Sequence, residues 1–151
     1  MTTPKPYRYR KVIRRRQAQP INRLLKIGPD EKLTGKVNGL DATDIEERFA
    51  RALASVGLKF RFQVRFWTAN SAPWQEKEVD FVVLAAGMFQ PVEVDGQIGH
   101  RTSAQLGRDA IREVLLNAIF RRLGYLPLVR VKWFELETQE MADEVVRRMF
   151  R

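Results

Sequence analysis

The sequence contains no cysteine and only one histidine, His100. The absence of cysteine excludes disulfide bonds and thiolate metal sites. It also agrees with a reducing compartment, so we expect a cytoplasmic location. Any bound metal ion must therefore be held by oxygen ligands or by His100.

Long apolar runs are also missing, and we expect no segment that crosses a bilayer and no membrane partner. The N-terminus is positively charged, as in a signal peptide, but no apolar stretch follows it, so export is not indicated. Of the 151 residues, 44% are apolar and 30% are charged, which is typical of a globular protein with one domain and extensions.

Acidic residues are absent from the first 16 positions, and the whole chain carries a formal net charge of +9. This charge predicts a polyanionic partner such as nucleic acid, with an acidic membrane surface as the weaker alternative. We interpret residues 1–40 as a basic, largely extended arm and residues 41–151 as the folded domain; a solvated tail is the alternative for the arm. The candidate phosphate contacts in the arm are Arg8, Arg10, Lys11, Arg14, Arg15 and Arg16.

The order of predicted elements indicates the fold class. Thr43 and Glu46 have the spacing of a capping box, and the apolar residues after them recur at helical spacing up to Gly57, which predicts a helix over residues 44–56. Strands are predicted at 59–66, 78–84, 90–95 and 126–131, with a turn at residues 86–87, and helices at 104–123 and 139–150. The result is an α/β fold with a mixed four-stranded sheet, one helix on each face and a C-terminal helix.

Two of these elements have a clear apolar pattern. In the strand at 59–66 we expect Phe60, Phe62, Val64 and Phe66 on one face. Arg61 and Arg65 would then form a basic outer face that contacts nucleic acid. The expected buried stripe of the helix at 104–123 consists of Leu106, Ala110, Ile111, Val114, Leu115, Ala118, Ile119 and Leu123.

Three carboxylates interrupt the apolar strands at 78–84 and 90–95. Asp80 lies near the start of the first strand, and Glu93 and Asp95 lie at the end of the second. Buried like charges need a cation to offset their repulsion. Glu46 could join them from the first helix, although it could equally serve only the capping box. Oxygen ligands of this kind favour Mg²⁺ or Mn²⁺, with Asp80, Glu93 and Asp95 as the metal ligands.

The order of these motifs resembles the PD-(D/E)XK nuclease superfamily, and most closely its branch similar to very-short-patch-repair endonucleases. The matching positions are Glu46, the segment from Phe60 to Gln63, Val79-Asp80-Phe81, Glu93-Val94-Asp95-Gly96 with His100, and Asp109 with Arg112. The resemblance covers about residues 43–131. It implies a restriction-endonuclease-like core and hydrolysis of DNA phosphodiesters, with Asp80 as the central metal ligand, Glu93 as a second ligand and Glu46 near the metal water.

The sequence departs from the superfamily pattern at one catalytic position. Asp95 stands where the pattern has a lysine, and His100, a candidate general acid or base, follows it by five residues. Three functions therefore remain open. The first is a metal-dependent DNA endonuclease or nickase, with DNA preferred to RNA as the partner. The second is a catalytically inactive nuclease-fold protein that acts as a nucleic-acid-binding or structural module of a larger assembly, and the third is a basic RNA-associated protein. A homodimer and a larger assembly both remain open as oligomeric states.

Overall fold

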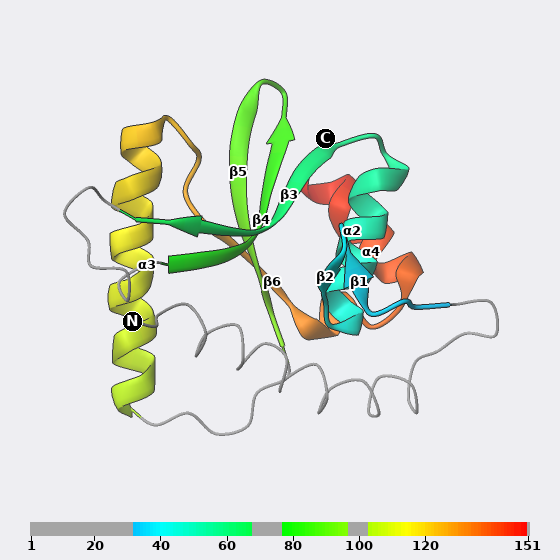
Figure 1. Cartoon of the computed structure of the whole chain (residues 1–151), viewed down its shortest axis with the longest axis horizontal. Helices are drawn as coiled ribbons and strands as arrows, with labels where there is room; N and C mark the ends of the chain where they lie inside the picture. The colour runs from blue at the N-terminus through cyan, green and yellow to red at the C-terminus, as the bar shows by residue number, and fades with distance from the viewer. Residues whose placement is uncertain (1–31, 68–76, 97–102, 151) are drawn as a thin grey trace.

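A computed structural model describes residues 32–67, 77–96 and 103–150 (Figure 1). Its strands are β1 (Lys36–Val37), β2 (Leu40–Asp41), β3 (Lys59–Phe66), β4 (Lys77–Ala85), β5 (Met88–Asp95) and β6 (Val129–Lys132). Its helices are α2 (Asp44–Ser55), α3 (Ser103–Leu123), the short 3-10 helix η2 (Trp133–Glu135) and α4 (Gln139–Met149).

The main sheet has the strand order β3-β4-β5-β6. β3, β4 and β5 form an antiparallel meander, whereas β6 pairs with β5 in parallel. A parallel neighbour requires a crossover, and α3 makes up most of the connection from β5 to β6. The sheet is therefore mixed, and the predicted α/β class is confirmed.

Helices cover both faces of this sheet. α2 and α4 lie side by side on one face and α3 lies on the other (Figure 1). The α2/α4 side holds the larger core, in which Phe81 packs edge-on against Phe49 with 5.0 Å between ring centroids and contacts Phe62 at the same distance. The α3 side holds a smaller core around Phe66, Val79, Val82, Leu116 and Phe120.

Local sequence signals set the ends of several elements. Thr43 accepts a hydrogen bond from the Glu46 N–H while the Glu46 carboxylate accepts one from the Thr43 N–H, so the predicted capping box begins α2. Ala86 and Gly87 both have positive φ, 51° and 75°, in the two-residue turn between β4 and β5. The turn predicted at these residues is confirmed.

The prediction that one face of β3 carries all four of its alternate apolar residues is wrong. Phe60 and Phe62 pack into the α2/α4 core, whereas Val64 and Phe66 pack into the α3 core. The change of face occurs at Gln63, whose φ of 56° is left-handed and interrupts the extended geometry on which alternation depends. β4 changes face at the same level, because Val79 belongs to the α3 core and Phe81 to the α2/α4 core.

The predicted buried stripe of α3 is also wrong, except for Ile119, which is partly buried and packs against the α3 core. Leu106, Ile111, Val114 and Leu115 are 48–68% exposed, while Leu116 and Phe120 are the buried residues of this helix. The orientation of α3 differs from the expected one because charged residues lie at the end of the sheet that faces this helix. Arg112 and Glu113, which the sequence placed off the stripe, bind residues of β4, β5 and β6, so a polar side of the helix faces the sheet there.

The described part of the expected arm, residues 32–40, is bound to the domain. β1 and β2 form a small antiparallel hairpin, and Val37 is buried in the α2/α4 core. Glu47 of α2 holds the preceding residues, because its carboxylate accepts hydrogen bonds from the N–H groups of Thr34 at 3.0 Å and Gly35 at 2.7 Å. Within the described ranges, none of the helices is long and apolar enough to span a membrane.

Candidate functional site

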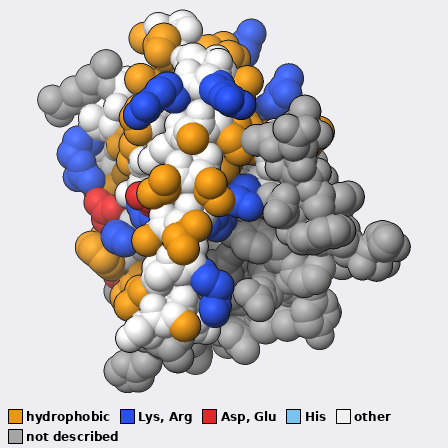
Figure 2. Space-filling model, turned by 90° about the vertical axis from the view of Figure 1, so that its left-hand side faces the viewer, with side chains coloured by type: hydrophobic (Ala, Val, Ile, Leu, Met, Phe, Trp, Pro, Cys, Tyr) orange, Lys and Arg blue, Asp and Glu red, His pale blue; other side chains and the backbone are white. Residues whose placement is uncertain are grey.

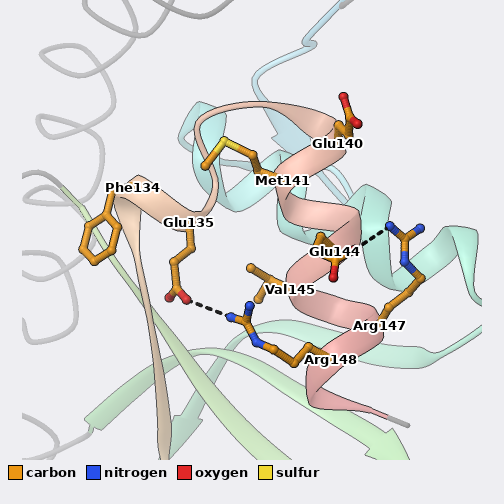
Figure 3. A pocket seen from close by; sticks show the side chains of 8 residues that line it. All are labelled: Phe134, Glu135, Glu140, Met141, Glu144, Val145, Arg147 and Arg148. Carbon is orange, nitrogen blue, oxygen red and sulfur yellow. Dashed lines mark hydrogen bonds and ion pairs between the residues drawn. The ribbon is translucent and has the colours of Figure 1, made fainter.

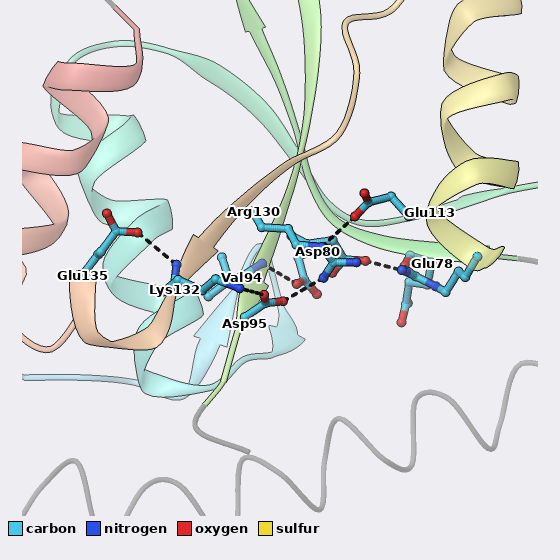
Figure 4. Close-up of polar contacts among 10 residues, drawn as sticks. Glu78, Asp80, Val94, Asp95, Glu113, Arg130, Lys132 and Glu135 are labelled. Carbon is cyan, nitrogen blue, oxygen red and sulfur yellow. Dashed lines mark hydrogen bonds and ion pairs between the residues drawn. The ribbon is translucent and has the colours of Figure 1, made fainter. Parts of the chain in front are cut away.

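Asp80 lies on β4 (Figure 4), and Glu93 lies on the neighbouring antiparallel strand β5. Phe81 and Val92 are paired across the ladder, and the two acids flank this pair at the same end. Both carboxylates are buried, with 1% exposure for Asp80 and 6% for Glu93. The structure therefore brings together the two residues that the sequence made central to a metal site.

The change of face in β4 explains how Asp80 enters the interior. It lies between Val79 and Phe81, which belong to different cores, at the level where Gln63 of β3 is left-handed. Its Oδ2 accepts a hydrogen bond from the Val94 N–H at 2.8 Å. Asp80 thus binds the backbone of the residue that follows Glu93, and this contact fixes the carboxylate against β5.

Glu93 is paired with Arg112 of α3. The Arg112 Nη2 donates to Glu93 Oε1 at 2.6 Å and also to the backbone carbonyl of Glu78 on β4. Arg112 therefore links α3 to both central strands. A charge-assisted contact of this kind offsets the cost of burying the Glu93 carboxylate.

Asp95 is contacted by two cations of β6. In the parallel register Glu93 pairs with Arg130 and Asp95 with Lys132. Asp95 Oδ1 accepts from Arg130 Nη1 and Oδ2 from Lys132 Nζ, both at 3.0 Å. Glu113 of α3 accepts from Arg130 Nε at 2.7 Å, so a continuous chain of ion pairs runs from α3 to Lys132 (Figure 4).

The electrostatics of this chain keep Arg130 charged. Burial lowers the pKa of Arg130, but the hydrogen bond to Glu113 and the charges of Asp95, Glu113 and Glu93 outweigh it, so its pKa lies above the ordinary value. Lys132 is half exposed and carries its ammonium group at the rim of the site. The arrangement is thus a buried pair of acids beside a strand with two basic side chains, Arg130 and Lys132.

The predicted three-ligand metal site is only partly assembled. Among residues 32–67, 77–96 and 103–150, no group of three or more acidic or histidine side chains is close enough to hold a metal ion. Magnesium needs fewer, because it commonly binds one or two carboxylates and completes its shell with waters and substrate phosphates. Asp80 and Glu93 fit that requirement, and Asp95 is directed to β6. The ligand set stays a prediction.

The other predicted site residues are placed as follows. The Glu46 carboxylate accepts the Thr43 N–H at 2.9 Å and so completes the cap of α2. Arg61 is exposed on β3, but it lies between two residues of the α2/α4 core, whereas Arg65 lies between two residues of the α3 core. By alternation they point to opposite faces, and the single basic face expected for β3 is wrong. His100 and the six basic residues of the arm lie outside the described residues.

Sequence reasoning missed Glu113, Arg130 and Lys132. The signal for Arg130 and Lys132 is the alternation Val129-Arg130-Val131-Lys132, which gives one polar edge to the last strand. That edge faces the carboxylates only because β6 is parallel to β5 in the observed register. The pairing of two strands separated by a long helix could not be derived from the residue pattern alone.

No family model matches the chain, and no curated protein matches it. A solved structure described as "Crystal Structure of Protein of Unknown Function AF1548" is similar to it, with 18% sequence identity and a TM-score of 0.39. The similarity covers 69% of this chain and 55% of that chain, so this chain spans about half the length of that protein. A likeness at this level carries no argument about function.

Proposed function

We propose that the protein is a metal-dependent DNA phosphodiesterase that cleaves or nicks its substrate. The observation that carries the proposal is the pair of buried carboxylates, Asp80 and Glu93, held on adjacent strands beside the cations of β6. Buried acids are costly unless they are paired, and buried ionisable groups with specific charged partners are found often at functional sites. The net charge of +9 supports DNA as the substrate.

The residues divide the chemistry between them. A Mg²⁺ or Mn²⁺ ion bound by Asp80 and Glu93 would polarise the phosphodiester and lower the pKa of the attacking water. Attack of that water on phosphorus would break the bond from phosphorus to the leaving oxygen, with the water giving up a proton and the leaving oxygen taking one up. Arg130 and Lys132, the basic residues of β6 paired with Glu93 and Asp95, would stabilise the negative charge on the phosphate. Arg112, which donates to Glu93 Oε1, would contact the substrate once Glu93 binds the metal.

The test is a cleavage assay on supercoiled, linear and branched DNA with Mg²⁺ or Mn²⁺, using Asp80→Asn. The amide oxygen of this variant still accepts the Val94 N–H, so the fold is preserved while the ligand charge is lost. We expect the rate to fall by at least ~100-fold. Asp41→Asn, the same change at an exposed acid of β2, is the matched control and keeps the wild-type rate. Wild-type cleavage by Asp80→Asn, or cleavage that survives a chelator, would contradict the proposal.

A second function is favoured by the ion pairs themselves. Glu93 is bound by Arg112, Asp95 by Arg130 and Lys132, and Asp80 by a backbone N–H, so protein donors already serve all three acids. This arrangement is what a nuclease-fold protein that binds nucleic acid without cleaving it would have.

Calorimetric titration with Mn²⁺ separates the two functions. The phosphodiesterase binds Mn²⁺ in the wild type and loses that binding in Asp80→Asn. In contrast, the binding module takes up no Mn²⁺, binds DNA and leaves it intact.

A further inference from the structure

α3 presents an apolar face that the described part of the chain leaves uncovered. Leu106, Ile111, Val114 and Leu115 are 54%, 63%, 68% and 48% exposed. Figure 2 shows apolar side chains along the length of this helix with basic side chains beside them. Exposed apolar side chains gathered along one helix are uncommon on a protein that works alone, and such a gathering indicates an interaction site.

The spacing on this face suits a compact protein partner. Ala104, Gly107, Ile111, Val114 and Ala118 follow one another at intervals of three, four, three and four residues, and all are exposed. This spacing keeps one line of side chains along the helix, with small residues at both ends and branched residues in the centre. The two central side chains, Ile111 and Val114, would anchor the contact.

The charges around the face exclude a simple pairing of two α3 helices. Arg108, Arg121 and Arg122 are exposed, and the acidic Glu113 is already paired with Arg130. An antiparallel pair centred on Val114 would bring Arg108 of one copy close to Arg121 of the other, and a parallel pair would oppose identical arginines. Both arrangements are repulsive, so the occupant of the α3 face must carry acidic groups.

A second apolar surface, on the other side of the sheet, is surrounded by acidic groups. A cavity of about 430 Å³ lies between η2 and α4, with Phe134, Met141 and Val145 in its lining (Figure 3). Phe134 is 53% and Met141 38% exposed. The acids that surround these side chains are Glu135, Glu140 and Glu144. Arg147 and Arg148 pair with two of them in contacts whose arginines are more than half exposed, and such pairs exchange partners at little cost.

We propose that the α3 face of one copy binds the η2/α4 cavity of a second copy. Ile111 and Val114 would cover Phe134 and Met141, while the arginines at the ends of α3 would meet the glutamates of the cavity. Because α3 and α4 lie on opposite faces of the sheet (Figure 1), each copy keeps one surface unused and can bind a further copy. The contact is therefore head-to-tail and builds a ring or a filament. It goes beyond the proposed function and does not rest on it.

The decisive experiment uses two variants that each remove one surface. Val114→Glu places a carboxylate on the α3 face, and the double variant Phe134→Ala/Met141→Ala removes the exposed apolar side chains of the cavity. All three positions are exposed, so both variants fold. Sedimentation analysis over a concentration series, on protein freed of nucleic acid, gives the masses. We expect the wild type to grow beyond a dimer with concentration, each variant alone to associate at least tenfold more weakly, and an equimolar mixture of the two variants to form a dimer and stop there.

The mixture distinguishes the head-to-tail contact from its alternatives, because only one intact α3 face and one intact cavity remain in it. Met88→Glu, at a position 41% exposed at the start of β5, is the control and assembles as the wild type does. The proposal is overturned if the wild type is monomeric throughout the series. It is also overturned if the mixture stays monomeric, or if only one of the two variants loses assembly, since that would indicate a symmetric contact through one surface.

Discussion

Glu47 shows how much of the N-terminal structure depends on a single carboxylate. It is 3% exposed and accepts hydrogen bonds from the Thr34 and Gly35 N–H groups, the Thr34 hydroxyl and Arg51. In the sequence it was an unremarkable neighbour of Glu46. Its partners Gly35 and Thr34 lie 12 and 13 positions earlier in the chain, and the helical pattern does not predict that they contact Glu47.

We predict that Glu47→Gln lowers the free energy of unfolding by about 2 kcal/mol, because charge-assisted contacts are lost and an amide N–H₂ faces N–H donors. Urea unfolding followed by circular dichroism measures the change. Glu144→Gln is the control, since Glu144 is 61% exposed and its ion pair with Arg147 is a surface contact worth little; its effect stays within about 0.5 kcal/mol. An equal decrease in the free energy of unfolding in both variants would show that the Glu47 carboxylate does not hold residues 34–35 against α2.

The turn between β4 and β5 offers a stabilising substitution. Ala86 has a φ of 51°, which an alanine adopts at a cost, and Gly87 follows with a φ of 75°. Asparagine tolerates this conformation and Asn-Gly is preferred in two-residue turns with two positive φ angles. We therefore expect Ala86→Asn to raise the free energy of unfolding by about 0.5–1 kcal/mol, measured as a higher urea midpoint. A lower midpoint would contradict this account of the turn.

At the scale of single residues, the sequence revealed the acids but not their partners. The sequence alone indicates Asp80, Glu93 and Asp95, because these charged residues interrupt otherwise apolar strands. Arg130 and Lys132 reach Asp95 from a strand 35 and 37 residues away. Their role follows from the register of β5 and β6, which only the folded chain displays.

At the scale of elements, β3 shows the limit of alternation as a guide. Its first half faces α2 and α4 and its second half faces α3, because Gln63 is left-handed. No glycine or proline marks this position, so a rule based on sequence cannot locate it. The capping box of α2, by contrast, is a local device, and its prediction succeeded because both partners lie within four residues.

The strain at Gln63 leads to a prediction for this strand. A β-branched residue is poorly accommodated at positive φ, so Gln63→Val should lower the free energy of unfolding by about 1 kcal/mol or more. Gln63→Gly, which relieves the strain but loses the hydrogen bond to the Asp41 carbonyl, stays within about 1 kcal/mol of the wild type. Arg61→Val, at an exposed position of the same strand, is the matched control. If it costs as much as Gln63→Val, the left-handed conformation is not the cause.

α3 shows a different limit. Its apolar residues follow helical spacing, and the expected stripe would be buried in a helix that packs by hydrophobic contact alone. Here Arg112 and Glu113 set the orientation of its middle turns, because their partners on β4, β5 and β6 are themselves largely buried and need opposite charges. Pairing of charges across elements thus outweighs the apolar pattern, and this competition is invisible without the sheet.

At the scale of the whole molecule, the net charge of +9 would govern the binding to DNA that we propose. Contacts between basic side chains and phosphates release counterions, so the logarithm of the binding constant falls linearly with the logarithm of salt concentration. We predict that replacing the six candidate residues of the arm (Arg8, Arg10, Lys11, Arg14, Arg15 and Arg16) by glutamine reduces this slope by about 5, at about 0.9 per lost phosphate contact.

The test is a measurement of the DNA-binding constant by fluorescence anisotropy with a labelled duplex, at salt concentrations from roughly 50 to 300 mM. Arg61→Gln and Arg65→Gln are measured beside the arm variant. Because these two residues point to opposite faces of β3, we expect only one of them to change the slope. An unchanged slope in the arm variant would assign the arm to a solvated tail.

The parallel strand β6 has a consequence for how the molecule reaches its native state. Asp95 and Lys132 are 37 residues apart, and their contact closes one of the long loops of the described chain. Contacts between distant residues carry a larger loop-closure entropy and tend to form late in folding. The meander from β3 to β5 can therefore assemble first, with its carboxylates still exposed to water, and their charge becomes compensated only when α3 and β6 dock. A chain interrupted before residue 129 would keep the acids and Arg112 but lose Arg130 and Lys132, the counterions of Asp95, so completion of the site reports completion of folding.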